Sequence, residues 1–465
     1  MPSVLIVGAG FGGIAAAIEL RRAGFTDVTV LERGETLGGV WRDNTYPGAG
    51  CDIPSPYYSF SFEPNRSWPL RFSLGPEIMA YLSRTAAKYG VRPRYGVTVT
   101  GAEFRSGRWH VSTSAGPFTA DVLVPAVGQL SEPYVPNLPG SFVGPAFHSA
   151  RWDHSVSLAG RRVAVIGTGA SAAQFIPHVV REAAAVTVFQ RSAPYVLPKP
   201  DVEYRPWQHR LFPLERAFFW GLLEVTTLGI QGNRAVTKAV ALLASRHLRR
   251  QVPDPVLRAK LTPDYPIGCK RVLFADDYYP ALTRPHVHVS TVEVDALTPS
   301  GVITTDGELH EVDVLVYATG FRTTDFLSTL SIHGPGGDLS ERWADGASAY
   351  LGMAVPDFPN MFMMYGPNTN LGSGSIVYML ERQARYLRQA VELLADGAST
   401  LDVRPDVAHR YDLELQRRLA GTAWASCRSW YRTDSGRITN NWPGLVSEYD
   451  RRTRTLSPAD YRVTA

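Results

Sequence analysis

The residues best suited to chemistry in this sequence start with a glycine-rich turn close to the N-terminus. An apolar run ends there in a G-x-G-x-x-G pattern formed by Gly8, Gly10 and Gly13. The first glycine permits the turn, the second lets the backbone approach a pyrophosphate, and the third lets the following helix pack on the strand. The next strand ends in Glu32, where a carboxylate can accept hydrogen bonds from ribose hydroxyl groups. This pattern predicts a dinucleotide-binding fold that holds the adenosine half of FAD.

A second turn of the same kind lies in "RRVAVIGTGASAAQFIPHVV". It contains Gly167 and Gly169, with Ala172 in the third position and Gln174 in the helix that begins there. The next strand ends in Arg191 instead of an acid. Because an acid repels a 2′-phosphate and a guanidinium pairs with it, we expect this turn, with Gln174 and Arg191, to bind NADPH. The alternative for Arg191 is a solvated charge at a strand end.

Two dinucleotide folds in one chain indicate that electrons pass from NADPH to FAD, and they predict an α/β protein with two Rossmann-like domains. The segment "EVDVLVYATGF" at 311–321 echoes "TADVLVPAVGQ" at 119–129. We interpret both as strands at which the chain crosses between the domains. We therefore predict three parts: a discontinuous FAD-binding domain at 1–140 and 312–465, a linker at 141–160, and an inserted NADPH-binding domain at 161–311.

Two further stretches have helical character. Apolar residues recur at helical spacing over 204–261, a stretch rich in Leu, Ala, Arg and Trp. It predicts a helical insertion of the NADPH-binding domain, which either covers the active site or serves packing alone. Near the C-terminus, "SIVYMLERQARYLRQAVELLADG" predicts a long helix closed by Gly397.

Composition narrows the class of protein. The 465 residues are 45% hydrophobic and 19% charged with a net charge of +4, which is typical of a globular protein without a nucleic-acid partner. The apolar run Phe218–Ile230 is shorter than the about 20 residues that a membrane span needs. We expect a buried or interfacial helix there, no integral membrane segment, no export signal and no metal site. Peripheral membrane contact stays open.

The cysteines bear on the cellular compartment. Cys51, Cys269 and Cys427 lie far apart in the sequence and form no C-x-x-C pair. We interpret this cysteine usage as typical of a protein in a reducing compartment such as the cytoplasm, where disulfides are rare. The same pattern argues against a reductase that works by disulfide exchange.

Two longer motifs carry a family resemblance. In "FVGPAFHSARWD", residues 142–153, the Phe, Gly, His, Trp and Asp fall on the spacing F-x-G-x-x-x-H-x-x-x-W-[P/D]. In "GGVWRDNTYPGAGCD", residues 38–52, Gly39 and Trp41 belong to [A/G]-G-x-W-x-x-x-x-[F/Y]-P-[G/M]-x-x-x-D. The chain thereby resembles type I Baeyer–Villiger monooxygenases. The resemblance runs nearly end to end and includes "PIGCKRVLFADDYY" and "CRSWYRTDSGRITNNWPG".

The resemblance implies a reaction of NADPH, FAD and molecular oxygen with a small apolar ketone. NADPH reduces the flavin, a C4a-peroxyflavin forms with oxygen, and its attack on the ketone gives an ester or lactone. The resemblance assigns the catalytic arginine to Arg271 and its orienting acid to Asp52. A permanent cation suits this step, because arginine keeps its proton beside an anionic oxygen.

The same resemblance assigns further cofactor contacts. Lys270 matches a residue that holds the NADP 2′-phosphate, Tyr58 a residue that contacts the flavin, and Trp430 a mobile-loop residue at the NADP ribose. The 142–153 motif matches a segment that coordinates movement of the two domains. Gly50 departs from the family, which often has a side chain such as Arg there, and this puts the flavin contacts at Gly50 in doubt.

Two other functions compete with this one. A related family oxygenates nitrogen or sulfur atoms, and its fingerprint lacks the Trp-Asp pair at 152–153. A flavoprotein that has lost oxygenation would act as an NADPH oxidase or as a binding module. The identity of the ketone, the regiochemistry and the oligomeric state are not encoded in any motif of the sequence.

Overall fold

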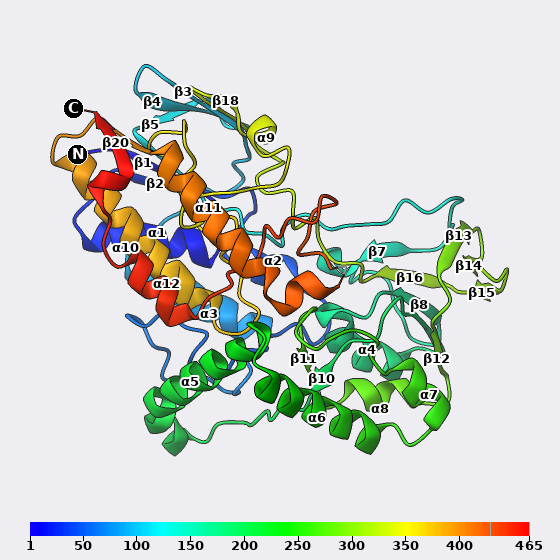
Figure 1. Cartoon of the computed structure of the whole chain (residues 1–465). Helices are drawn as coiled ribbons and strands as arrows, with labels where there is room; N and C mark the ends of the chain where they lie inside the picture. The colour runs from blue at the N-terminus through cyan, green and yellow to red at the C-terminus, as the bar shows by residue number, and fades with distance from the viewer. Residues whose placement is uncertain (428, 465) are drawn as a thin grey trace.

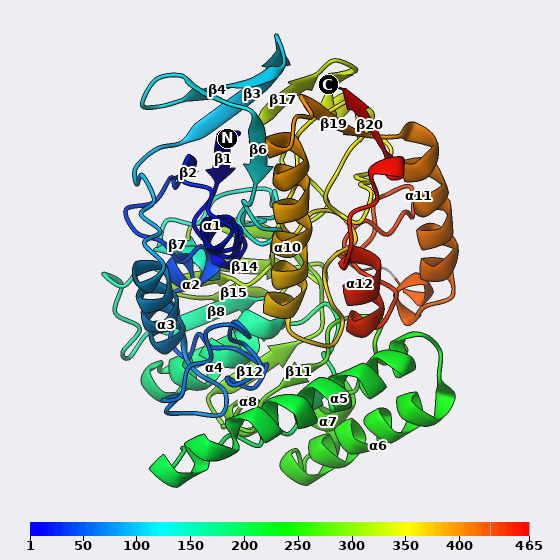
Figure 2. The ribbon, with the colours of Figure 1, turned by 90° about the vertical axis from the view of Figure 1, so that its left-hand side faces the viewer.

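The computed structural model describes residues 1–427 and 429–464, and its elements form two sheet-centred bodies side by side (Figure 1). The first body contains a parallel sheet with the order β2-β1-β6. Its strands are short apolar runs: β1 (Val4–Val7), β2 (Val28–Leu31) and β6 (Val122–Pro125). Because strands of this kind are buried on both faces, helices must cover them. Helix α1 (Phe11–Arg22) does so and packs along α10 (Ile376–Ala395) (Figure 2).

The second body contains a five-stranded parallel sheet with the order β12-β9-β8-β16-β7. Its strands are β7 (Ala146–His148), β8 (Arg162–Ile166), β9 (Ala185–Phe189), β12 (Val287–Ser290) and β16 (Val314–Tyr317). Helices α4 (Ala170–Glu182) and α8 (Tyr278–Leu282) pack on each other beside this sheet. The predicted fold class, α/β with two dinucleotide-binding sheets, is confirmed.

The two echoing segments occupy equivalent places in the two sheets. Strand β6 pairs with β1 in the first sheet, and β16 pairs with β8 in the second. Strand β16 therefore lies in the second sheet, although the predicted boundary at 312 groups it with the FAD-binding part. Strand β7, inside the predicted linker, pairs with β16. The division into domains remains a prediction.

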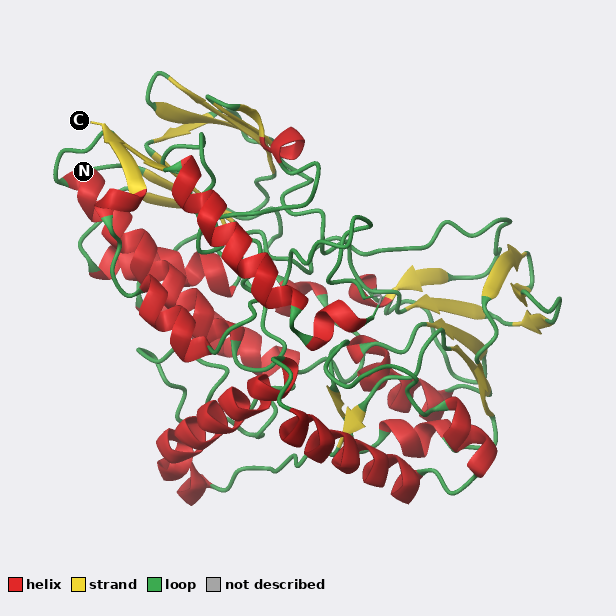
Figure 3. Cartoon of the chain, viewed as in Figure 1, coloured by secondary structure: helices red, strands yellow, loops and turns green. Residues whose placement is uncertain are grey.

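Smaller sheets extend both bodies (Figure 3). The sheet β18-β17-β3-β4-β5 comprises β3 (Val99–Arg105), β4 (Arg108–Thr113), β5 (Phe118–Ala120), β17 (Ser331–Gly334) and β18 (Gly337–Asp338). A second consists of β13 (Val294–Thr298), β14 (Gly301–Thr304) and β15 (Leu309–Glu311). Two pairs complete the set: β10 (Val196–Leu197) with β11 (Leu273–Phe274), and β19 (Thr400–Val403) with β20 (Tyr461–Thr464).

The 204–261 segment is helical, as predicted. It contains α5 (Phe212–Ile230), α6 (Arg234–Gln251) and α7 (Pro255–Lys260). Helix α5 reaches the first body, because Arg216 Nη1 donates to the carbonyl oxygens of Pro56 at 2.8 Å and Ser59 at 2.9 Å. No helix in the described ranges is long and apolar enough to cross a membrane.

The remaining helices belong to the first body. Helix α10 is the long helix expected near the C-terminus, and Gly397 follows it with a φ of 117°. The others are α2 (Val40–Asp43), α3 (Gly75–Lys88), α9 (Leu339–Arg342), α11 (Pro405–Ala420) and α12 (Val446–Thr453).

Candidate active site

The first glycine-rich turn brings backbone, rather than side chains, to the N-terminus of α1. Gly8 has a φ of 107°, and a Cβ atom on Gly13 would lie 1.9 Å from the Gly8 carbonyl oxygen. Gly10 precedes α1 and no side chain caps the helix. The first N–H groups of α1 are therefore available to an anion. The Cα atom of Gly39 faces Gly10, so two glycines leave room for a pyrophosphate.

Glu32 lies at the end of β2, is buried and already binds three donors. Its Oε2 accepts from the Ala9 N–H at 2.9 Å and its Oε1 from the Gly34 N–H at 2.8 Å. Arg42 Nη1 also donates to Oε1, at 2.6 Å. A carboxylate has about four acceptor positions, so one remains for a ribose hydroxyl. Sequence reasoning missed Arg42, although it lies within the 38–52 motif.

The second turn is the more open of the two. Gly169 precedes α4 without a side-chain cap, and a Cβ atom placed on it would meet no atom within 4 Å. Gly167 has a φ of 109°. This geometry suits the pyrophosphate of a second dinucleotide.

Two cations lie together beyond the end of β9. Lys270 Nζ donates to Ser192 Oγ at 2.6 Å and lies 4.4 Å from the centre of the Tyr265 ring. Desolvation and the charge of Arg191 both lower the pKa of Lys270. Two mutually repelling cations gain stability when a phosphate dianion comes between them. Arg191 and Lys270 thus fit the 2′-phosphate of NADPH.

The predicted catalytic pair is formed. Arg271 Nη2 lies 3.6 Å from Asp52 Oδ2, and the side chains are 47% and 7% exposed. Desolvation, the largest influence, lowers the pKa of Arg271, but the Asp52 carboxylate and the neighbouring Tyr431, Cys51 and Tyr365 together outweigh it, so the pKa of Arg271 is raised. The guanidinium therefore keeps its proton while part of it stays accessible to a reactant.

Gln174 connects α4 to the loop that carries Asp52. Its Nε2 donates to the Gly50 carbonyl oxygen at 2.9 Å and to Asp52 Oδ1 at 3.3 Å, and its Oε1 accepts from Tyr46 Oη at 2.9 Å. The Gly50 N–H donates to the same Oε1 at 3.4 Å. A Cβ atom on Gly50 would lie 3.2 Å from Leu74 and Ser73 atoms. The departure at Gly50 therefore fits a close approach of this loop to residues 73–74 of the same body.

Two aromatic side chains from the 38–52 motif and its surroundings pack beside the first turn. Trp41 Nε1 donates to Tyr58 Oη at 3.1 Å, and the rings meet edge to face at 5.7 Å. Tyr58 also contacts Phe11 of α1 at 5.4 Å. Burial raises the pKa of Tyr58, so its phenol stays protonated and available as a hydrogen-bond donor.

The two family motifs meet through α4. Trp152 packs on Phe175 of α4 at 5.2 Å, and Phe175 packs on Tyr46 at 5.9 Å. The His154 ring bonds Thr45 Oγ1 at 2.9 Å. Helix α4, beside the second sheet, thus packs between the linker and the 38–52 motif of the first body.

His148 is buried within the linker and is held neutral. Its Nδ1 accepts from the Ala150 N–H at 3.1 Å, so the proton of the neutral ring is on Nε2. Burial lowers the pKa of His148 to about 4. His148 therefore serves packing and hydrogen bonding without a charge at neutral pH.

Known proteins share this arrangement over the whole chain. The family model described as pyridine nucleotide-disulphide oxidoreductase matches residues 5–238. A Baeyer-Villiger monooxygenase of Streptomyces coelicolor is 42% identical over 99% of this chain and 92% of its own length, and one of Pseudomonas aeruginosa is 40% identical over 99% and 91%. The chain belongs to the Baeyer–Villiger monooxygenase family.

Solved structures agree with this membership. OTEMO in complex with FAD and NADP has a TM-score of 0.90 at 27% identity, covering 100% of this chain and 99% of that one. Cyclohexanone monooxygenase from Rhodococcus sp. Phi1 bound to NADP+ has a TM-score of 0.90 at 26% identity and covers 100% of both chains. The prediction of a monooxygenase of this family is confirmed.

Two tyrosines that lie near Arg271 were not predicted from the sequence. Tyr365 and Tyr431 are electrostatic neighbours of Arg271, and burial raises the pKa of both, that of Tyr431 to about 12. Tyr365 Oη donates to Asn370 Oδ1 at 2.7 Å, and Tyr365 has a φ of 60°. Five of the seven described non-glycine residues with positive φ lie in 351–368, and strained backbone gathers at functional sites. No short motif marks this strain.

The cysteine pattern, interpreted above as typical of a reducing compartment, does not predict the disulfide that the structure contains. Cys269 and Cys427 form a disulfide with a Cα–Cα distance of 6.2 Å, although 158 positions separate them in sequence. Sequence spacing does not reveal such a pair, because tertiary structure alone brings the two segments together. Cys51 is free and buried, and burial raises the pKa of its thiol to about 12.

The disulfide connects two predicted site segments. Cys269 immediately precedes Lys270 and Arg271, and Cys427 precedes Trp430 by three residues. Trp430 is 41% exposed, packs on Tyr431 at 4.1 Å, and accepts at its carbonyl from Thr323 Oγ1 at 2.9 Å. The place of Trp430 fits its predicted role at a mobile, accessible edge, which remains a prediction.

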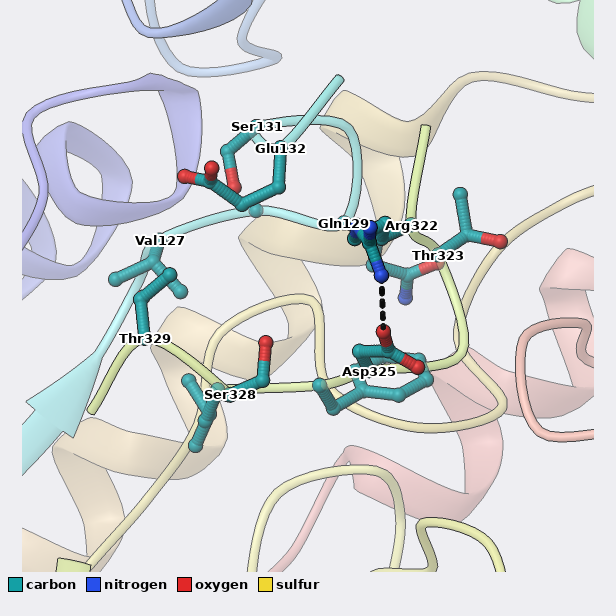
Figure 4. A pocket seen from close by; sticks show the side chains of 12 residues that line it. Val127, Gln129, Ser131, Glu132, Arg322, Thr323, Asp325, Ser328 and Thr329 are labelled. Carbon is teal, nitrogen blue, oxygen red and sulfur yellow. Dashed lines mark ion pairs between the residues drawn. The ribbon is translucent and has the colours of Figure 1, made fainter. Parts of the chain in front are cut away.

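A small pocket lies where the two crossing segments meet, between 127–132 after β6 and 322–329 after β16 (Figure 4). Arg322 and Asp325 form an ion pair across it at 4.0 Å. Gln129 borders it and donates to the Tyr365 and Gly366 carbonyl oxygens at 3.0 Å. Neither Arg271 nor Asp52 lines this pocket, so it is distinct from the predicted catalytic pair.

Proposed function

We propose that Arg271 and Asp52 are the catalytic pair of a Baeyer–Villiger oxidation that converts a small apolar ketone into an ester or lactone. The enzyme is an FAD-dependent, NADPH-using monooxygenase. When bound, the two cofactors would supply hydride transfer and oxygen activation. The chain itself must hold the two cofactors, exclude water and direct charge at the reacting oxygen atoms.

The observation that carries the proposal is the geometry of the pair. Negative charge develops on oxygen when an oxygen nucleophile adds to a ketone carbonyl. A fixed guanidinium favours that charge, and it cannot neutralise it by proton transfer. Asp52, buried and 3.6 Å away, fixes the direction of Arg271, and the Gln174 amide fixes Asp52. Oxygenation of nitrogen or sulfur calls for an electrophilic oxygen instead, which this cation does not favour.

The cofactor contacts follow from the same geometry. We assign the FAD pyrophosphate to the turn at Gly8, Gly10 and Gly13, beside Gly39, and the ribose to Glu32. Trp41 and Tyr58 lie on the flavin side. For NADPH we assign the pyrophosphate to Gly167 and Gly169, and the 2′-phosphate to Arg191 and Lys270. Trp430 closes over the NADP ribose in this proposal.

The cytoplasmic location is also a proposal. The composition of the chain supports it. The Cys269–Cys427 disulfide argues against this location, because disulfides persist mainly in oxidising compartments.

Product analysis with cyclic, aryl and long-chain ketones tests the function. NADPH oxidised, oxygen consumed and ester formed should match one another for at least one ketone class. NADPH oxidation that releases hydrogen peroxide with every ketone, and forms no ester, would support the oxidase alternative. Formation of sulfoxides or N-oxides without esters would support the related family.

A further inference from the structure

The helical segment 204–261 presents an unusual number of apolar side chains to solvent. It is about one-eighth of the chain, yet it holds ten of the twenty large apolar side chains that are exposed in the described residues. These are Trp207, Leu211, Leu214, Phe218, Trp220, Leu222, Val225, Leu242, Leu243 and Val256. Single exposed apolar residues are common on protein surfaces, but a contiguous set marks an interaction site.

Four exposed apolar residues of α5 form one stripe. Leu214, Phe218, Leu222 and Val225 follow one another at intervals of three and four residues, so they share one side of the helix. Leu214 is 70% exposed and Phe218 is 64% exposed. The other side of α5 packs inward through buried Phe212, Thr227 and Ile230, so the outer stripe does not serve the core.

The same segment is strongly basic. It contains ten Lys and Arg against three Asp and Glu, whereas the whole chain has 47 against 43. Two of the three acids are already engaged, since Glu215 pairs with Arg71 at 2.8 Å and Glu224 accepts from the Val446 N–H at 2.7 Å. The third, Asp254, caps α7. Exposed cations in the segment are Arg205, Arg210, Arg234, Lys238, Arg246, Arg249 and Arg250.

We propose that α5 and α6 form a docking surface for the headgroup region of an anionic lipid bilayer. The two helices pack together and form the lower edge of the molecule in Figures 1 and 2. The α5 stripe enters between the headgroups, and the basic side chains of α6 bind lipid phosphates. Trp207, just before α5 and 60% exposed, suits the boundary between headgroups and acyl chains.

Charge distinguishes a lipid surface from a second copy of the chain. Self-association through the α5 stripe would bring two equally basic segments together, and their repulsion opposes that contact. An anionic bilayer neutralises them. The helices lie on the bilayer and do not cross it, in agreement with the absence of a spanning helix from the described residues.

Sedimentation of the FAD-loaded enzyme with lipid vesicles tests the proposal. We expect binding to phosphatidylcholine vesicles that contain about one-third phosphatidylglycerol, weaker binding to phosphatidylcholine alone, and release by salt. The double variant Leu214→Asp with Phe218→Asp should lower the partition coefficient at least about tenfold. The triple variant Arg246→Glu, Arg249→Glu and Arg250→Glu should do the same at low salt.

Helix α11 provides a matched control. Leu413 is 57% exposed there, and Arg417 is exposed one turn later. Leu413→Asp with Arg417→Glu should leave vesicle binding unchanged. Flavin content and the thermal unfolding midpoint establish that each variant is folded.

Three results would overturn the proposal. The wild-type enzyme could fail to bind anionic vesicles, or the α5 and α6 variants could both bind these vesicles as well as the wild-type enzyme does. Alternatively, sedimentation without lipid could reveal an oligomer that the α5 variant dissociates, which would assign the stripe to contact between copies. None of these results depends on the ketone reaction.

Discussion

At the residue scale, the chemistry rests on a few charges whose positions depend on uncharged neighbours. Arg271 lies 3.6 Å from Asp52, and Asp52 accepts from the Gln174 amide at 3.3 Å; in the proposed mechanism Asp52 directs Arg271. The family resemblance predicted the pair: Asp52 closes the 38–52 motif, and Arg271 lies in the matching segment "PIGCKRVLFADDYY". It could not predict Tyr365 and Tyr431, because their proximity to Arg271 results from packing and from backbone with positive φ in 351–368.

Arg191 provides a test of cofactor choice. Arg191→Ala removes one charge-assisted contact to the 2′-phosphate, so KM for NADPH should rise about 10- to 100-fold while KM for NADH changes little. Steady-state kinetics with both cofactors measure this. Arg161→Ala, at another exposed arginine of the second body, is the control. Equal damage with both cofactors would contradict the assignment.

His148 provides a test of pH dependence. Its pKa is about 4 in the folded protein and about 6.5 when unfolded, so the unfolded state binds more protons between these values. Stability should therefore fall as pH drops from 6.5 to 4, by up to about 3 kcal/mol from this group. His148→Gln should lack this part of the loss. The thermal midpoints of the wild-type protein and of His148→Gln, measured from pH 8 to pH 4, test this. A difference between the two midpoints that stayed constant over this range would contradict the argument.

At the element scale, α4 makes several contacts that connect the two bodies. Its N-terminus faces the proposed NADPH pyrophosphate, Phe175 packs between the two family motifs, and Gln174 holds the Asp52 loop. The glycine spacing predicted the helix and its start. Its contacts with the first body were not predicted, because the side-chain period of a helix does not say which neighbour each face meets.

Gln174→Leu separates positioning from cofactor binding. The variant keeps the volume and removes the bonds to Gly50 and Asp52, so kcat should fall about tenfold or more while KM for NADPH changes little. Gln389→Leu removes an amide that bonds Arg385 and Arg454 far from the site and controls for stability. A rise confined to KM for NADPH would instead support the direct cofactor contact predicted for Gln174.

At the scale of the whole molecule, a covalent bond ties Cys427 to Cys269 of the second body. The predicted two-sheet architecture is observed, since repeated glycine turns and echoing strands encode it locally. The Cys269–Cys427 bond is not encoded locally. The contact of α5 with the loop at Pro56 through Arg216 is likewise not encoded locally, because contacts between distant segments leave no periodic signal.

Thiol titration tests the covalent link. The native enzyme should expose no reactive thiol, because Cys51 is buried, and two thiols should appear after a dithiol reductant. Cys427→Ser releases the Trp430 loop from the Lys270 segment, so NADPH binding should lose about 1 kcal/mol of pre-organisation. KM for NADPH should therefore rise several-fold. Cys51→Ser is the control. Two reactive thiols before reduction would contradict the link.

The most direct test of the central claim compares product formation with NADPH oxidation in Arg271→Ala. If Arg271 favours negative charge on the reacting oxygen atoms, the variant should bind FAD and still oxidise NADPH, but ester formation should fall about 10²- to 10³-fold. The electrons should appear as hydrogen peroxide. Asp52→Ala should show the same pattern more weakly, because the arginine remains but is no longer directed. An Arg271→Ala enzyme that forms ester at the wild-type rate, with NADPH and ester still matched, would contradict the account.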